Sequence, residues 1–262
     1  MKGLSAALPF PIGHVSDLHE SAPGSFTFEI VIYETEGVIF AQLSRPAEIP
    51  LDVALPARNT RCLLTVEEQA GTLYASALPG GTEAVERAAQ FLAAGEDEHA
   101  ALLTSEQEAE SLLQGKVADP IGAAIGGYTL LRLNELDRTH NWTENLAAWF
   151  PWLPDGAVIA GEKEARRGQH RQALDYFFQA RTRGLPLFTD GFSILVSRLR
   201  QYEANLDIPG QLLKEYAAHI QAFSAQLEKW SPFVDFSALT LTFRAAELTD
   251  PGGSQHPLKI DN

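Results

Sequence analysis

The alternation of hydrophobic and polar residues divides the chain into a strand-rich first part and a helix-rich second part. In the first part, short runs rich in β-branched and aromatic residues fall at 25–33, 38–43, 51–55, 61–66 and 72–77. Runs of this length, with turn residues in the gaps, are typical of antiparallel strands. We therefore predict a β unit of about five strands over residues 25–78, either a sheet or a small sandwich. Five strands bury little apolar surface, so we expect this unit to pack against the helices.

The residues that precede this unit have no clear period. Residues 1–24 contain three prolines, which favour turns over regular strands, and we predict an irregular arm there. Its side chains include His14, Asp17 and His19, the densest group of metal-capable residues in the sequence. Because solvated polar side chains are expected in such an arm, we assign no metal site and no cofactor.

After residues 79–81 the apolar positions recur with the period of a helix. Residues suited to N-caps precede three of the predicted helices, namely Thr82, Asp119 and Asn141, and residues 104–107 (Thr-Ser-Glu-Gln) offer a capping box before another. Further helices are predicted at about 157–167, 170–183, 189–203 and 210–230. Glycines and alanines between 120 and 131 would let neighbouring helices approach closely.

Residues 234–243 alternate between apolar and polar side chains, which predicts one more strand. A lone strand needs a sheet, so we expect it to return to the N-terminal one. The helical domain then covers 79–233, and 244–262 form a tail. The predicted fold class is α+β, with a small N-terminal antiparallel β-sheet or sandwich packed on a C-terminal helical bundle.

Small residues in the helical part fall where two neighbouring helices could pack closely. The small residues concerned are Gly161, Gly168, Ala173 and Ala180, and His170 and Phe177 occupy aromatic positions beside them. Residues 157–186 thereby resemble a tetratricopeptide-type helical hairpin, although Ala157 and Glu164 replace the tryptophan and tyrosine of that motif, and Pro186 comes one residue late. The resemblance implies stacked hairpins that hold peptides in a groove, and it brings no catalytic residues.

Charge is unevenly distributed along a chain with a formal net charge of −14. Residues 1–120 contain 18 acidic and 6 basic residues, whereas residues 151–204 contain 6 acidic and 8 basic ones. The overall charge would repel nucleic acid, so we expect no such partner. No apolar run approaches the roughly 20 residues of a membrane span, and no signal-peptide pattern stands out. We therefore expect a cytoplasmic protein without a membrane partner.

Two groups of side chains are candidates for partner binding. The first is basic and would either attract an acidic segment of another protein or form a solvated helix face: Arg166, Arg167, Arg171, Arg181 and Arg183. The second is aromatic and would either line a ligand pocket or fill the core where helices meet: Trp142, Trp149 and Trp152.

No constellation of catalytic residues stands out, since Gly-x-Ser-x-Gly, the phosphate-binding loop and His-Glu-x-x-His are all missing. The single cysteine, Cys62, excludes an internal disulfide, and we expect it to be buried and inert. A catalytic site would have to draw on scattered residues near helix ends, namely His140, Asp155, His170 and Asp190.

These features favour a non-catalytic protein-binding adaptor or scaffold that uses a helical surface. A regulatory subunit or protease-processed accessory factor of a bacterial multi-protein system is one alternative. A small enzyme with an unrecognised site is another. The expected partner is another protein, with an acidic segment as the candidate ligand.

Overall fold

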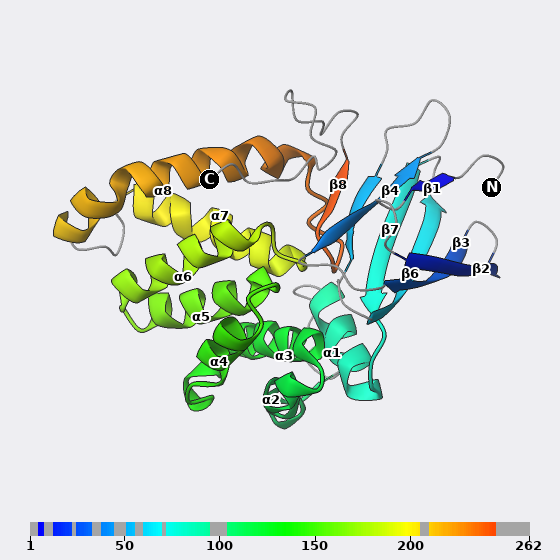
Figure 1. Ribbon diagram of the computed structural model, residues 1–262, viewed down its shortest axis with the longest axis horizontal. Helices are drawn as coiled ribbons and strands as arrows, with labels where there is room; N and C mark the ends of the chain where they lie inside the picture. The colour runs from blue at the N-terminus through cyan, green and yellow to red at the C-terminus, as the bar shows by residue number, and fades with distance from the viewer. Residues whose placement is uncertain are drawn as a thin grey trace.

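The computed structural model describes residues 5–7, 13–22, 25–32, 38–44, 51–55, 60–69, 72–94, 104–204 and 210–244. Strands gather at one end of the molecule and helices at the other (Figure 1), which confirms the α+β fold class. Within these residues, no helix combines the length and the apolar character needed to cross a membrane.

Antiparallel strands form two four-stranded sheets, ordered β1-β4-β5-β8 and β2-β3-β6-β7. The strands that precede the first helix are β1 (Ser5–Ala7), β2 (Gly13–Ala22), β3 (Ser25–Ile32), β4 (Ile39–Ser44), β5 (Leu51–Leu55), β6 (Thr60–Gln69) and β7 (Thr72–Pro79). β3 to β7 coincide with the five predicted strands. Buried side chains of both sheets share one hydrophobic core, as in a sandwich.

The prediction of an irregular arm over residues 1–24 is wrong, because β1 and β2 lie there and β2 pairs with β3. Its register shifts between Ser16 and Leu18 and again between Glu20 and Ala22. Such bulges interrupt the period of two, so the pattern could not be recognised. The side chains of the suggested metal-capable group, at positions 14, 17 and 19, lie outside those that the structure describes.

The helices follow in the order α1 (Glu83–Ala93), α2 (Glu106–Gln114), η2 (Gly115–Val117), α3 (Pro120–Leu133), η3 (Leu136–Arg138), α4 (Trp142–Trp149), α5 (Pro154–Arg166), α6 (His170–Arg183), α7 (Thr189–Glu203), α8 (Gly210–Trp230) and η4 (Ser231–Phe233). Thr82 and Asp119 cap their helices through side-chain oxygens, as predicted. The capping box of α2 starts one residue later than predicted, at Ser105 with Glu108. Asn141 precedes α4 but makes no such bond. α5 starts earlier than predicted because Pro154 is tolerated at the first helical position.

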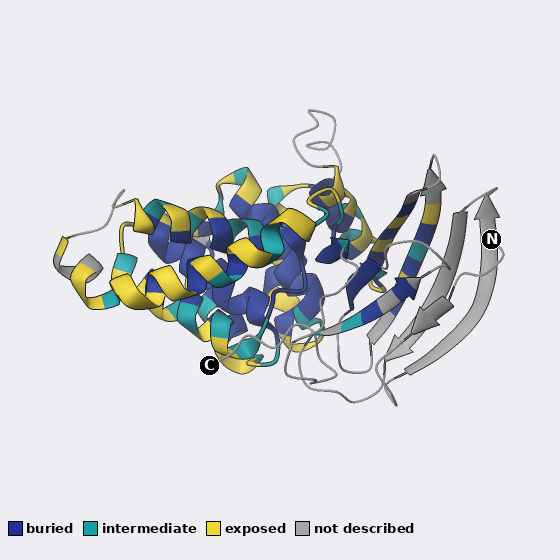
Figure 2. Ribbon diagram, turned by 90° about the horizontal axis from the view of Figure 1, so that it is seen from above, coloured by how far each residue is buried: buried dark blue, intermediate teal, exposed yellow. Residues whose placement is uncertain are grey.

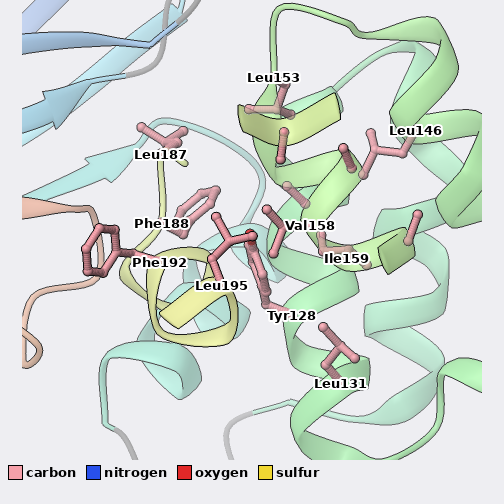
Figure 3. Close-up of a cluster of buried hydrophobic side chains, with 14 of the residues drawn as sticks. Tyr128, Leu131, Leu146, Leu153, Val158, Ile159, Leu187, Phe188, Phe192 and Leu195 are labelled. Atoms are coloured by element: carbon pink, nitrogen blue, oxygen red, sulfur yellow. The ribbon is translucent and has the colours of Figure 1, made fainter. Parts of the chain in front are cut away.

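α5 lies at the centre of the helical half, with residues 154–165 all buried. Figure 2 shows the buried residues concentrated where the helices meet. Glycines permit this close packing, because a Cβ atom at Gly161 would lie only 2.6 Å from the Phe177 ring. A Cβ atom at Gly127 would lie 2.9 Å from the Ile159 side chain. Figure 3 shows Ile159 among the side chains that fill this core.

The prediction of a strand over 234–243 is wrong in extent, since β8 covers only Thr242–Arg244. The preceding residues turn back on β8, and the Asp235 N–H donates to the Thr242 carbonyl at 2.8 Å. The Asp235 carboxylate accepts hydrogen bonds from the Ser237 N–H and hydroxyl. An aspartate bonded two residues ahead favours a turn, which the alternating pattern concealed.

Residues 239–243 join the sheets to the helices by hydrogen bonds on both edges. Toward the sheet, β8 pairs with β5, and the Leu241 carbonyl accepts from the Ala54 N–H at 2.8 Å. Toward the helices, the Leu241 N–H donates to the Leu187 carbonyl at 2.8 Å. The link between α6 and α7 therefore continues the backbone pairing of the sheet.

Phe243 is the hydrophobic anchor of this junction and is completely buried. Its ring lies 5.9 Å from Phe40, 6.3 Å from Phe192 and 5.6 Å from Trp230, measured between centroids. These partners belong to β4, α7 and α8. One side chain thus contacts the sheet and two helices at once.

The Asp155 carboxylate lies at the start of α5, completely buried beneath the link between α6 and α7. Its Oδ1 accepts from the Tyr128 hydroxyl at 2.8 Å and from the Phe188 N–H at 3.2 Å. Its Oδ2 accepts from the Leu187 N–H at 2.8 Å. Burial raises the pKa of Asp155 to about 6, although these hydrogen bonds oppose the rise.

Phe243→Ala should lower the free energy of unfolding by about 3–5 kcal/mol, because it opens a cavity where three elements meet. Phe236→Ala is the matched control, since Phe236 lies in the same segment but is 52% exposed. It should cost less than about 1 kcal/mol. Urea denaturation followed by tryptophan fluorescence measures both. Equal losses would show that the junction does not depend on Phe243.

Asp155→Asn removes a group whose pKa is about 6 in the folded protein and near 3.8 without burial. The folded state binds this proton more tightly, so the wild type loses stability as the pH rises from about 4 to about 6. The free energy of unfolding of the wild type minus that of the variant should fall by about 2 kcal/mol between pH 4 and pH 7. Urea denaturation across this range tests it, and a constant difference would contradict it.

Candidate functional site

A pocket of about 580 Å³ lies beside the turn between α5 and α6, and we call it the polar pocket. The end of α3, η3, the last turns of α5, the start of α6, and α7 all contribute to its wall. Its polar lining consists of Asn134, Asp137, Lys163, Arg166, His170 and Arg198. Cationic side chains outnumber acidic ones in this lining, so its chemistry suits an anion.

Two arginines of the pocket are held by one buried carboxylate, that of Glu162. Arg198 donates from Nε and Nη2 to its two oxygens at 2.6 and 2.7 Å, a bidentate pair. Arg166 donates from Nε to Oε1 of the same group at 2.8 Å. Arg166 Nη1 also donates to the Leu131 carbonyl at 2.9 Å, at the end of α3. These contacts fix both guanidinium groups before any ligand arrives.

Lys163 lies in the pocket wall with its side chain completely buried. Its ammonium donates to the His140 carbonyl, to the Thr143 hydroxyl at 3.3 Å and to Glu144 at 2.9 Å. Burial pushes the pKa of Glu144 upward, but its bonds with Lys163 and Thr143 hold it below its usual range. Lys163 therefore joins α5 to α4 as part of a satisfied ion pair.

His170 closes the pocket at the first residue of α6, with Nδ1 at 3.3 Å from the Tyr202 hydroxyl. Nearby, Arg167 Nε donates to Asp137 at 2.9 Å, so the acid of the lining is already paired. The pocket thus contains hydrogen-bond donors whose positions are set by neighbouring side chains.

The five arginines named from the sequence are not gathered in one groove. Arg166 lines the polar pocket, Arg167 lies beside it, and Arg171 forms a bidentate pair with Glu215 of α8. Arg181 lines a second hollow of about 350 Å³ between α6 and α8, together with aromatic rings. The remaining one, Arg183, donates to Gln179 at 3.3 Å, and burial lowers its pKa.

Two of the three tryptophans lie near the same cation, and the third lines neither the polar pocket nor the second hollow with them. The Lys116 ammonium lies 6.0 Å from the centre of the Trp142 ring and 5.5 Å from that of Trp149. Lys116 is itself buried, which lowers its pKa. Trp152 packs against the main helical core. Two tryptophans therefore contact a cation of their own chain by cation–π interaction, a role that sequence reasoning did not suggest.

Sequence reasoning also missed Arg198 and Asn134 as binding-site residues, and it named His170 only as a candidate for catalysis. The spacing of Glu162 and Arg166, four residues apart on one helix, was a usable signal for an ion pair. Nothing local connects Arg198 to them, because α6 separates α5 from α7 in the sequence. Only the packing of α7 on α5 brings its guanidinium to the pocket.

The residues considered for catalysis have individual partners. Asp155 accepts from Tyr128, whereas Asp190 pairs with Arg132 at 2.6 Å. His140 contacts the Trp142 ring. Cys62 is completely buried, and burial raises the pKa of its thiol to about 12, so it is inert as expected.

Comparison with known proteins places these observations in a family. A protein from a Desulfuromonadales bacterium, named "Probable protease", is 35% identical over 114 residues, which are 43% of this chain and 14% of that protein. The chain thus spans about a seventh of the length of this curated relative. No solved structure matches the chain. Residues 87–257 match the family described as the Y4kD C-terminal domain. This range is more than half of the chain and includes every residue that lines the polar pocket. The chain therefore belongs to the family of the Y4kD C-terminal domain.

Proposed function

We propose that this chain is a non-catalytic protein-binding adaptor or scaffold of the cytoplasm, and that its helical half binds an acidic segment of another protein. The observation that carries the proposal is the polar pocket, where one buried glutamate holds two arginines in place at the wall. Fixed donors bind an anion without losing further conformational entropy. Charge complementarity of this kind gives a protein interface its selectivity.

The hairpin of α5 and α6 supports the proposal. Gly161 of α5 packs against Phe177 of α6, where the tetratricopeptide motif also has a small residue opposite an aromatic one. Gly168 lies in the turn with a φ of 72°, a conformation that favours glycine. We infer that this hairpin, followed by α7 and α8, serves as a tetratricopeptide-like binding scaffold.

The family and the relative suggest the setting in which this binding takes place. The shared region is described as a C-terminal domain, and the relative carries the name of a probable protease and is much longer. We propose that the chain acts as a regulatory or accessory component beside a protease in a bacterial multi-protein system. In that setting its polar pocket would recruit the partner on which the system acts.

Binding of an acidic peptide tests the adaptor role. A fluorescein-labelled peptide rich in glutamate should bind the full chain, and its glutamine analogue should not. The dissociation constant should rise by about tenfold or more from about 50 to about 500 mM salt, because salt screens the contact. Fluorescence anisotropy gives both values. Affinity that does not depend on salt, or equal affinity for the analogue, would refute the acidic-ligand proposal.

The name of the relative favours a second candidate, in which the chain itself contributes to proteolysis. Incubation with fluorescein-labelled casein tests it, with trypsin as the positive control. The adaptor proposal expects no release of fluorescent peptides above the rate without protein. Release that scales with the concentration of the purified chain would favour the enzyme instead.

A further inference from the structure

We propose that Arg166 holds a side-chain carboxylate of the acidic segment within the polar pocket. This inference rests on the proposed function, because it names the ligand group and the residue that recognises it. Three observations lead to Arg166. They are the contacts of its guanidinium, the hydrogen bonds that the neighbouring cations already make, and the charge of Glu162.

The guanidinium of Arg166 is fixed on one side and available on the other. Nε is bound to Glu162, and Nη1 is bound to the Leu131 carbonyl and to Asn134 Oδ1 at 3.2 Å. Nη2 makes no hydrogen bond within the described part of the chain, and the side chain is 38% exposed. A carboxylate entering the pocket would therefore meet a donor whose direction is already set.

The other cations near the pocket are less suited to this task. The Lys163 ammonium has three protons and already donates to His140, Thr143 and Glu144. Arg167 uses all three guanidinium nitrogens on Asp137 and Glu164. Arg198 binds both oxygens of Glu162. Among the described residues, Arg166 therefore remains as the cation whose Nη2 is available to a ligand.

The charge of Glu162 indicates the valence of the ligand. Its single negative charge is shared between two guanidinium groups, because Arg198 binds it through two bonds and Arg166 through one. A carboxylate adds one negative charge beside Arg166. A phosphate would add close to two in a partly buried pocket, and the second would lack a counter-charge there. We therefore assign the pocket to a carboxylate.

Variants at an arginine inside the pocket and at one outside it test the assignment with the glutamate-rich peptide. Arg166→Gln should weaken binding by at least about tenfold, and Arg166→Lys should do so as well, because lysine lacks the planar fork. Arg200→Gln is the matched control, since Arg200 is also an exposed arginine paired with an acid, Glu228, but is not among the residues that line the pocket. It should change the dissociation constant by less than about twofold. Equal losses in both variants would overturn the inference in favour of general charge attraction.

A second measurement uses the wild-type chain and so does not depend on the folding of any variant. Phenylglyoxal modifies arginines, and mass spectrometry maps the sites. Bound peptide should slow modification of Arg166 but not of Arg200, which pairs with Glu228 on the exposed side of α7. Protection of neither residue, while the peptide remains bound, would refute the inference and leave the proposed function intact. Failure of the wild type to bind the peptide would refute the proposed function itself.

A peptide with phosphoserine in place of glutamate distinguishes the two anions. It should bind no more tightly than the glutamate peptide, because the second charge has no partner in the pocket. Binding that is tighter by tenfold or more would show that the site prefers phosphate and would overturn the carboxylate assignment.

Discussion

One buried carboxylate positions the backbone link through which the helices join the sheets. Asp155 lies in the core, where an unsatisfied charge would be costly, so its oxygens require donors. Tyr128 provides one, and the backbone of Leu187 and Phe188 provides the others. The opposite edge of that backbone pairs with residues 239–241, which in turn pair with β5. Asp155 therefore fixes the α6–α7 link, and the other edge of that link pairs with the segment that reaches the sheet.

Buried charges that need partners also occur at the polar pocket. α5 is buried on every side, yet it also carries Glu162, Lys163 and Glu164. Each of these charges attracts an opposite charge from the surroundings, and the partners of Glu162 are the guanidiniums of Arg166 and Arg198. Two side chains in the wall of the pocket, those of Arg166 and Arg198, thus neutralise a charge of a buried helix. A binding site of this origin is rigid, because its side chains cannot move without exposing or stranding a buried charge.

Local sequence patterns predicted most of the elements and little of the site. The five strands from β3 to β7 and the limits of α6, α7 and α8 follow from periodicity and from turn residues that act over a few positions. The same patterns gave wrong predictions at β2 and before β8. The bulges of β2 and the turn at Asp235 each place an irregularity inside an alternating pattern. Arg166 was identified from its basic neighbourhood. Arg198 was not, because only tertiary packing brings α7 to the end of α5.

The family match covers the helices and β8 but not the sheet with which β8 pairs. The match begins inside α1 and includes β8, whereas β1 to β7 lie outside it. The shared unit therefore contains a strand whose sheet is supplied by another part of the chain. Leu239, Leu241 and Phe243 are buried against that sheet and the helices, and the N–H and carbonyl groups of β8 pair with β5. Unpaired backbone groups at such an edge are costly and promote aggregation. In this chain the N-terminal sandwich covers the edge of β8, because β5 pairs with it.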